Sequence, residues 1–342
     1  MPLVSPYAVS ATQYAQAPYA PVVSWTPRTA ALAGETMGTT WSARLVMPPG
    51  LAEPRVQAAI QAALNTVVAQ MSTWESDSDL SRFNTAEPGW HVLPSAFYSV
   101  LDCALTLARD TQGAFDPTVG PLVNAWGFGP AGRHAAPPNT ATLQALSARC
   151  GWQRLKLDAS TCAAWQAGGT ALDLSGIAKG YGVDAACQAL DALGITHYLM
   201  EVGGELRARG HRADQQPWRI AIEIPDASGD FGLALPLRDQ AIATSGDYRR
   251  YRGHAPGQHS HTIDPRTCRP IANGVASLTV IHADCMHADA LASALTVLGE
   301  TAGMAYAEQA NIAALFVMRQ ADDFRPSASS AMQRLLEQSA PC

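Results

Sequence analysis

This 342-residue chain contains the stretch Tyr198-Leu-Met-Glu-Val-Gly-Gly-Glu-Leu-Arg-Ala-Arg209, which indicates its fold class. It contains two β-strand signals, over residues 198–202 and 206–209, and only a short turn separates them. Hairpin-like gaps of this kind recur between other strands, without a strict strand–helix–strand rhythm. We therefore predict an α+β fold with mixed, mostly antiparallel sheets and flanking helices.

Hydrophobic periodicity locates the remaining elements. Apolar residues at helical spacing predict an amphipathic helix over 53–71. The same argument predicts helices over 95–111, 140–148, 178–193 and 286–298. β-Branched and aromatic residues predict strands over 39–47, 218–224, 241–245, 277–282 and 313–319, and two more within 152–164.

The N-terminal segment differs in composition from the rest. Residues 1–34 are rich in Ala, Pro, Ser and Tyr, and predict a flexible arm or a strand-like extension. The segment lacks the basic and apolar regions of a signal peptide, which favours a cytoplasmic location. Regular structure is expected from about Glu35, and we predict a single domain over 35–342 that is long enough to form two lobes.

Composition excludes several classes of protein. Hydrophobic residues make up 47% of the chain and charged residues 15%, which is ample material for a core. No run of 18 apolar residues occurs, so no transmembrane segment is predicted. The net charge of -6 argues against a nucleic-acid surface. Seven cysteines without a CxxC pair offer neither a zinc ribbon nor a thioredoxin-type motif.

A first chemical motif is Asp173-Leu-Ser-Gly-Ile-Ala-Lys-Gly-Tyr181. It predicts a strand that ends in an acid, then a small turn, with Lys179 at the head of a helix. Free N–H groups and the helix dipole make such a helix start a seat for phosphate, and Lys179 adds a full charge. An ordinary strand-to-helix turn has the same appearance.

A second motif runs from Ala114 to Phe128 and contains two prolines and several glycines. These residues restrict an irregular backbone, and Trp126 and Phe128 are expected to be exposed as stacking surfaces for a planar ligand. The alternative is a loop that caps the core.

A third motif combines Ala243-Thr-Ser-Gly-Asp-Tyr248 with Ser260-His-Thr-Ile-Asp-Pro265. An imidazole with a near-neutral pKa can accept the proton of an attacking hydroxyl, which makes His261 a candidate general base. A structural histidine beside Asp264 is the alternative.

A fourth motif lies in the predicted helix over 286–298. Asp289 and Ser293 stand four residues apart, so their oxygens share one helix face. Carboxylate, hydroxyl and carbonyl oxygens suit Mg²⁺. The nearby His282, Cys285 and His287 suggest zinc as an alternative, but their spacing fits no standard tetrahedral site.

The motifs together resemble the ApbE family of FAD:protein FMN transferases, in the family's order and over most of the chain. The matching stretches are Met37-Gly-Thr-Thr-Trp41, Met71-Ser-Thr-Trp74, Ser78-Asp-Leu-Ser-Arg-Phe-Asn84, Gly113-Ala-Phe-Asp-Pro-Thr-Val-Gly120, Leu172-Asp-Leu-Ser-Gly-Ile-Ala-Lys-Gly-Tyr181, Val202-Gly-Gly-Glu205, Ala243-Thr-Ser-Gly-Asp-Tyr248, His261-Thr-Ile-Asp-Pro265 and Ala288-Asp-Ala-Leu-Ala-Ser293.

The resemblance implies an active-site cleft between lobes that holds FAD over a Mg²⁺ ion. It implies metal binding by Gly176 (through its carbonyl), Asp289 and Ser293, and a catalytic set of His261, Asp289 and Lys179. The implied FAD contacts are Met37, Trp74, Ala114, Phe115, Asp116, Asp173, Lys179 and Ile263.

The implied reaction is the Mg²⁺-dependent transfer of FMN from FAD to a threonine or serine hydroxyl, with release of AMP. The implied partner is an acceptor flavoprotein subunit of the respiratory redox type. Because such proteins are usually exported or lipid-anchored, a periplasmic or inner-membrane-anchored location is the alternative to a cytoplasmic one. Two other functions remain open, namely an FAD pyrophosphatase that yields FMN and AMP, and a non-catalytic FAD-binding protein.

Overall fold

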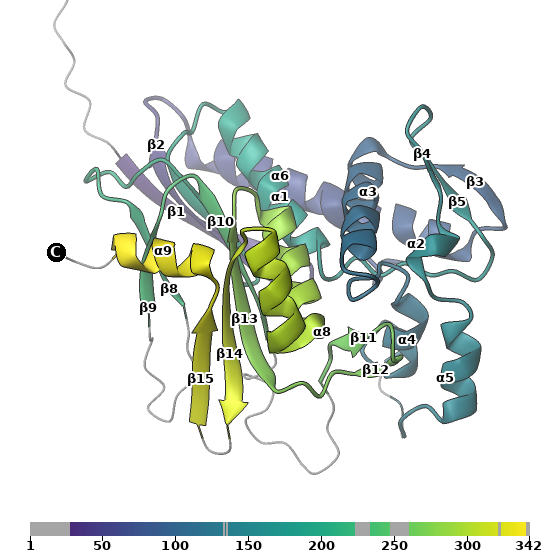
Figure 1. The fold of residues 1–342 in the computed structure, drawn as a ribbon. Helices are drawn as coiled ribbons and strands as arrows, with labels where there is room; N and C mark the ends of the chain where they lie inside the picture. The colour runs from purple at the N-terminus through teal and green to yellow at the C-terminus, as the bar shows by residue number, and fades with distance from the viewer. Residues whose placement is uncertain are drawn as a thin grey trace, which may run out of the picture.

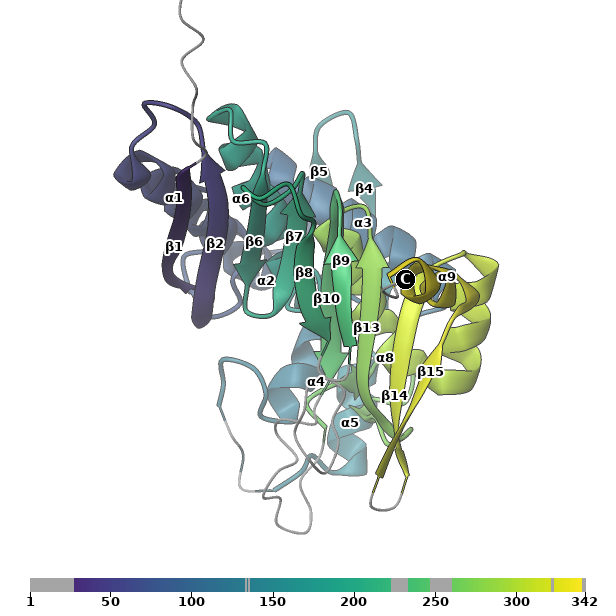
Figure 2. The same ribbon diagram turned by 90° about the vertical axis from the view of Figure 1, so that its left-hand side faces the viewer.

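The computed structural model describes residues 28–132, 134, 136–222, 233–246, 260–320 and 323–339. An eight-stranded sheet runs through this part of the chain, and each neighbouring pair of its strands is antiparallel (Figures 1 and 2). In spatial order, its strands are β1 (Arg28–Thr36), β2 (Thr39–Met47), β6 (Tyr198–Val202), β7 (Glu205–Arg209), β10 (Gln240–Gly246), β13 (Val275–His282), β14 (Ala313–Gln320) and β15 (Asp323–Ala328). The predicted α+β fold is confirmed.

Helices and a hairpin cover the two faces of this sheet. On one face lie α1 (Glu53–Met71), α6 (Ala178–Ala192) and α8 (Cys285–Gln309). On the other lie α9 (Ser330–Ser339) and the hairpin of β8 (Trp218–Ile222) and β9 (Leu233–Leu237), as Figure 2 shows. Each face therefore has its own core, one around Leu45, Ile60 and Tyr198 and the other around Trp218 and Met332.

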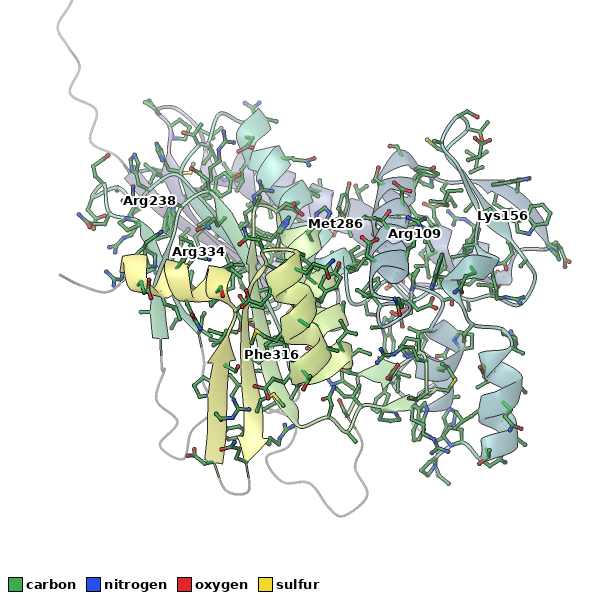
Figure 3. All side chains as sticks on the ribbon, in the orientation of Figure 1. Arg109, Lys156, Arg238, Met286, Phe316 and Arg334 are labelled. Atoms are coloured by element: carbon green, nitrogen blue, oxygen red, sulfur yellow. The ribbon has the colours of Figure 1, made fainter. Side chains whose placement is uncertain are left out.

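A second group of elements lies on the far side of α8 from the large sheet in Figure 1. Its helices are α2 (Asp79–Thr85), α3 (Ser95–Asp110), α4 (Gly120–Ala125), α5 (Thr140–Ser147) and a 3₁₀ helix (Trp152–Arg154). Its strands are β3 (Gly89–Val92), β4 (Leu157–Asp158), β5 (Ala163–Gln166), β11 (Ile263–Asp264) and β12 (Arg269–Pro270). One buried cluster joins both groups, because Phe97 and Leu101 of α3 belong to the same cluster as Leu291 of α8 and Phe316 of β14. Figure 3 labels Phe316.

The helix α8 is kinked rather than continuous. Gly299 has φ 75° inside it, a conformation that glycine adopts without steric cost. Beside the kink, the side-chain amide of Asn273 donates to the carbonyl of Thr296 at 2.8 Å. A distant loop therefore satisfies a carbonyl just before the kink. The predicted end at residue 298 coincides with this kink, and a second helical segment follows it to Gln309.

The predicted N-terminal arm extends too far. Strand β1 begins at Arg28 and pairs with β2 along its whole length, so residues 28–34 belong to the sheet. Its sequence is rich in Ala and Gly, which have little β-propensity, and its pairing with β2 determines the strand. The rest of the arm, residues 1–27, lies outside the described residues. Within the described part, no helix is long and apolar enough to cross a membrane.

Candidate active site

The turn that leads into α6 is held by the neighbouring loop. The N–H of Asp173 donates to the carbonyl of Pro117 at 2.8 Å. The carboxylate of Asp173 accepts a hydrogen bond from the N–H of Ser175, also at 2.8 Å. These contacts place Asp173 next to the loop that carries Asp116, and they place Lys179 in the first turn of α6.

Lys179 lies between two buried carboxylates. Its ammonium group forms an ion pair with Oε1 of Glu205, and it interacts electrostatically with Asp289. Burial opposes the charge of Lys179, but the two carboxylates outweigh that effect and raise its pKa. Burial and Asp289 raise the pKa of Glu205 to about 7, although Lys179 opposes the shift. One cation, Lys179 in the first turn of α6, therefore interacts with two carboxylates, those of Glu205 and Asp289.

Glu205 received no role from the sequence, although the stretch from Val202 to Glu205 was among the matching motifs. It is 3% exposed, and its Oε2 has no hydrogen-bond partner within the described part of the chain. The signal that could have found it is an acid placed directly after Gly203-Gly204, where a strand restarts. Glu205 is therefore an addition to the candidate site.

Asp289 is held against the first turn of α6. Its Oδ2 accepts a hydrogen bond from the N–H of Gly180 at 2.9 Å. Burial raises the pKa of Asp289, while Lys179 and this N–H lower it. A hydrogen on Gly180 in place of a side chain permits the contact, because a Cβ there would lie 2.2 Å from the carbonyl oxygen of Cys285.

The other two predicted metal-binding positions also meet. A Cβ on Gly176 would lie 2.8 Å from Oγ of Ser293 and 3.4 Å from the ring of Phe115. Ser293 Oγ lies 3.4 Å from Oγ of Ser245 on β10. The structure therefore brings Gly176, Ser293 and Phe115 together, one helical turn along α8 from Asp289.

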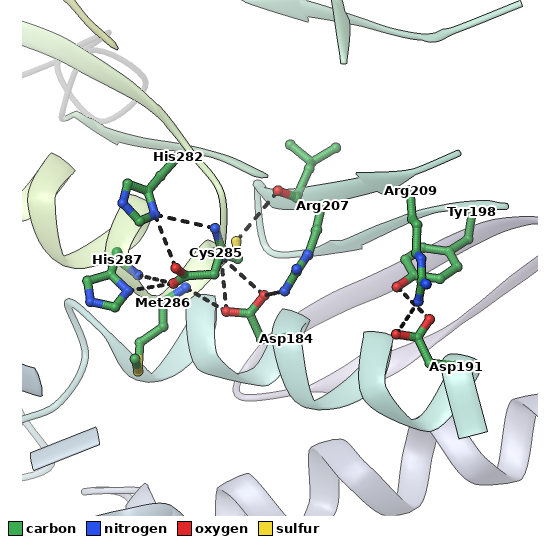
Figure 4. A network of polar contacts seen from close by, with 11 residues as sticks. Asp184, Asp191, Tyr198, Arg207, Arg209, His282, Cys285, Met286 and His287 are labelled. Carbon is green, nitrogen blue, oxygen red and sulfur yellow. Dashed lines mark hydrogen bonds and ion pairs between the residues drawn. The ribbon is translucent and has the colours of Figure 1, made fainter. Parts of the chain in front are cut away.

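A separate network fixes the start of α8 relative to α6 (Figure 4). The buried Asp184 of α6 pairs with Arg207 of β7 at 2.5 Å. The same carboxylate accepts hydrogen bonds from the N–H groups of Cys285 and Met286, each at 2.9 Å from Oδ2. Asp184 thus satisfies the first free amides of α8 and determines where Asp289, one turn later, must lie.

The carboxylate of Asp116 accepts hydrogen bonds from other residues of the protein. Oδ1 accepts from the N–H and the hydroxyl of Thr118, and Oδ2 accepts from the N–H of Trp152 at 3.0 Å. Burial raises its pKa, although these bonds oppose the shift. Ala114 and Phe115 are also buried. Hydrogen bonds and burial therefore hold this loop inside the protein.

The expected exposure of Trp126 and Phe128 is wrong. Both side chains are partly buried against the small cluster that contains Ile263 and Cys268. The indole N–H of Trp126 donates to the carbonyl of Cys268 at 3.0 Å. This segment caps a core, which was the alternative interpretation of the motif.

The remaining predicted FAD positions differ in environment. Met37 occupies the turn between β1 and β2 with φ 50°, and its terminal methyl would be 2.8 Å from a Cβ on Gly182 of α6. Trp74 is 65% exposed, and its backbone N–H donates to Oγ of Ser72. Ile263 is buried in β11. Of these three, only Trp74 presents a largely exposed side chain.

His261 precedes β11 and is partly buried. Asp264, the proposed structural neighbour of this histidine, instead accepts two hydrogen bonds from the guanidinium of Arg266, both at 2.9 Å. The last two residues of the 243–248 stretch, Asp247 and Tyr248, lie outside the described residues. The structure therefore places Lys179, Asp289 and the Gly176–Ser293 pair close together. The carboxylate of Asp264 forms its hydrogen bonds with Arg266 of the same loop.

Comparison with known proteins identifies the family of this chain. The sequence profile described as the ApbE family matches residues 37–316. A Vibrio cholerae protein named FAD:protein FMN transferase is 42% identical over 89% of this chain and 92% of its own, and a Haemophilus influenzae protein of that name is 38% identical over 90% and 91%.

Solved structures agree with these relatives. The flavin transferase ApbE from Vibrio cholerae superposes with a TM-score of 0.85 at 41% identity, covering 91% of this chain and 100% of its own. The apo form of the Pseudomonas stutzeri flavinyl transferase ApbE gives 0.84 at 36% identity, covering 93% and 99%. The chain therefore belongs to the ApbE family, as the motifs predicted, and is an enzyme of the transferase class.

Proposed function

We propose that this enzyme transfers FMN from FAD to a threonine or serine hydroxyl of a partner flavoprotein, in a Mg²⁺-dependent reaction that releases AMP. The names of its relatives support FAD as the substrate and a protein as the acceptor. The observation that carries the proposal is the contact between α6 and α8, which brings Lys179 and Asp289 together at the start of α6.

The donor atoms at this contact fit Mg²⁺. The carbonyl of Gly176, the carboxylate of Asp289 and the hydroxyl of Ser293 are all hard oxygen ligands, which this ion prefers. The buried Oε2 of Glu205 adds a further oxygen close to Lys179. When bound there, Mg²⁺ would supply positive charge that neutralises the pyrophosphate oxygens of FAD.

The protein's own residues would then bind and orient the substrate. Lys179, held by Glu205, directs a second positive charge towards the pyrophosphate from a helix start that already favours anions. The exposed ring of Trp74 offers a stacking surface for a flat ring of FAD. The hydrogen-bonded loop around Asp116 forms one wall of the site.

His261 would act as the general base. A threonine hydroxyl is a poor nucleophile until its proton is removed, and an imidazole accepts a proton near neutral pH. As the hydroxyl oxygen attacks the FMN phosphorus, His261 takes its proton and the bond from phosphorus to the AMP oxygen breaks. FMN becomes joined to the acceptor through a phosphoester, and AMP leaves. We propose an acceptor subunit of a respiratory redox complex.

The test is an assay of covalent flavin on the acceptor. The purified chain is incubated with FAD, Mg²⁺ and an acceptor domain that carries one threonine in a flavinylation-type sequence. A fluorescent acceptor band on a denaturing gel is expected, and it should disappear with EDTA. His261→Ala and Asp289→Asn should each lower the rate at least about 100-fold, a typical effect of losing a general base or a metal ligand.

Matched variants control for general damage to the protein. His134→Ala and Asp102→Asn replace exposed residues of the same types and should retain the wild-type rate. An acceptor in which the threonine is replaced by alanine should stay dark. Release of FMN and AMP without a fluorescent acceptor would instead indicate an FAD pyrophosphatase, and bound but intact FAD would indicate a carrier.

A further inference from the structure

A second cluster of ligand-type side chains lies at the junction of β13 and α8. Nδ1 of His282 is 3.1 Å from Oδ2 of Asp284, and Nδ1 of His287 is 2.7 Å from Oδ1 of the same carboxylate (Figure 4). One ligand atom from each of the three residues lies within 4.8 Å of the other two. None of these side chains has a role in the proposed transfer reaction.

Rigid elements position the cluster. His282 is the last residue of β13, and Asp284 is the N-cap of α8, where it accepts a hydrogen bond from the N–H of His287 at 3.0 Å. The next residue, Cys285, is anchored through its N–H by Asp184. The three side chains therefore start from a strand end and a capped helix, which is the precision that a metal site requires.

Cys285 does not belong to the cluster. Its side chain is fully buried, and its sulfur contacts the carbonyl of Leu206 at 3.6 Å. The zinc alternative based on His282, Cys285 and His287 is therefore wrong in its sulfur ligand. Asp284 takes the place of that cysteine, because the chain turns at this residue and lets both imidazoles reach one carboxylate.

Cys103 of α3 supports the ring of His287 from the other side. Its sulfur lies 3.5 Å from Nε2 of His287, while Nδ1 of the ring faces Asp284. Histidines that bind a metal through one nitrogen commonly use the other for a hydrogen bond that orients the ring. Cys103 occupies that outer position, which leaves Nδ1 as the ligand atom.

The donor types and spacing select the class of ion. Two imidazole nitrogens and one carboxylate oxygen suit Zn²⁺ and related transition ions, whereas Mg²⁺ prefers oxygen. Zinc lies about 2.0–2.2 Å from such atoms, so tetrahedral ligands are roughly 3.3–3.5 Å apart. The three ligand atoms lie within 4.8 Å of one another, and the side chains of His282 and His287 are 33% and 46% exposed, which leaves both rings room to rotate towards one ion.

We propose that His282, Asp284 and His287 bind one divalent transition-metal ion of the zinc class, at a site separate from the oxygen ligands of the transfer reaction. The ion would connect the end of β13 to the first turn of α8. A fourth position stays open to water, because the cluster lies at the surface. The proposal rests on this geometry alone and does not depend on the proposed function.

The experiment is a zinc titration of the full-length chain, stripped with EDTA and dialysed, in the presence of excess Mg²⁺. Calorimetry is expected to show one equivalent of Zn²⁺ bound, and His282→Ala and His287→Ala should each weaken it at least about tenfold. Co²⁺ in place of Zn²⁺ should give the visible absorption of a tetrahedral site. Far-UV circular dichroism checks that both variants are folded.

Matched variants separate this site from other zinc-binding groups. Asp289→Asn and His134→Ala should bind Zn²⁺ like the wild type, because neither contributes to the cluster. Cys103→Ser retains a hydrogen-bonding group and should keep the stoichiometry. No stoichiometric binding, or binding that survives both histidine substitutions, would overturn the proposal. Loss of binding in Asp289→Asn would also overturn it, because the ion would then occupy the other site.

Discussion

The N–H of Gly180 donates a hydrogen bond to Oδ2 of Asp289 at 2.9 Å, and this bond joins the first turn of α6 to α8. The contact exists because the two helices approach unusually closely at Gly180. A Cβ at this position would meet the backbone of Cys285 and Cβ of Asp289 at 2.2 and 2.7 Å. Neither neighbour can move without displacing α8, so the candidate metal ligand depends on a glycine of another helix.

Gly180→Ala is therefore expected to separate the helices. Overpacking against backbone typically costs about 1–3 kcal/mol, so urea denaturation should show a loss of this size. Gly182→Ala in the same helix is the control, since the nearest atom to its Cβ would be the flexible end of Met37 at 2.8 Å, and Leu64 would lie at an ordinary contact distance of 3.5 Å. If Gly180→Ala is as stable as Gly182→Ala, the close approach does not matter.

The buried ion pair of Asp184 should contribute far more than an exposed pair on the same two elements (Figure 4). Asp184→Asn weakens the pairing with Arg207 and the amides of α8, and we expect a loss of about 2–4 kcal/mol in the free energy of unfolding. Asp191→Asn affects the exposed pair with Arg209, for which about 0–1 kcal/mol is typical. Equal losses in denaturant titrations would contradict this account.

Lys179 should control how stability depends on pH. Burial and Asp289 raise the pKa of Glu205 to about 7, above its ordinary 4.5, so the native state holds this proton more tightly than the unfolded chain. Stability from this group is present below pH 4.5 and is lost as the pH rises through 7. In Lys179→Met the pKa rises further, which extends the loss above pH 7.

The measurement for this prediction is the free energy of unfolding between pH 5 and 9. Lys156→Met, which removes an exposed lysine, is the matched control and should follow the wild-type curve. A Lys179→Met curve parallel to the wild type above pH 7 would show that Lys179 does not balance the buried acids.

Trp74 should matter for binding and not for folding. Its ring is 65% exposed, so Trp74→Ala should change stability by less than about 0.5 kcal/mol. Loss of a stacking surface should weaken FAD binding roughly tenfold. Trp90→Ala removes another exposed tryptophan, 50% exposed on β3, and should leave FAD affinity unchanged in a flavin fluorescence titration. Equal affinities for both variants would remove Trp74 from the FAD site.

Strong periodicity explains which elements could be predicted. The boundaries predicted for the strand at 39–47 and the helix at 53–71 match β2 and α1, because an alternating or helical apolar pattern defines each of them. Strand β1 carries no such pattern and depends on pairing with β2. The helix predicted to end at 298 stops one residue before the kink at Gly299, where a distant loop satisfies the carbonyl of Thr296.

In the candidate site, too, local sequence spacing predicts some contacts, whereas others depend on packing between distant segments. The four-residue spacing of Asp289 and Ser293 on one helix could be predicted from sequence, since helical geometry alone brings them to one face. The pairing of Lys179 with Glu205, 26 residues away, could not, because it follows from the packing of α6 against β7. The cluster of His282, Asp284 and His287 likewise could not be predicted without the turn between β13 and α8.

The central claim is that this enzyme moves FMN onto a hydroxyl rather than onto water. The most direct test measures AMP by chromatography and covalent FMN on the acceptor by absorbance in one reaction. We predict equal amounts of both products, with almost no free FMN, and no AMP when the acceptor threonine is replaced by alanine. AMP and free FMN formed in equal amounts, at the same rate with or without acceptor, would contradict the account.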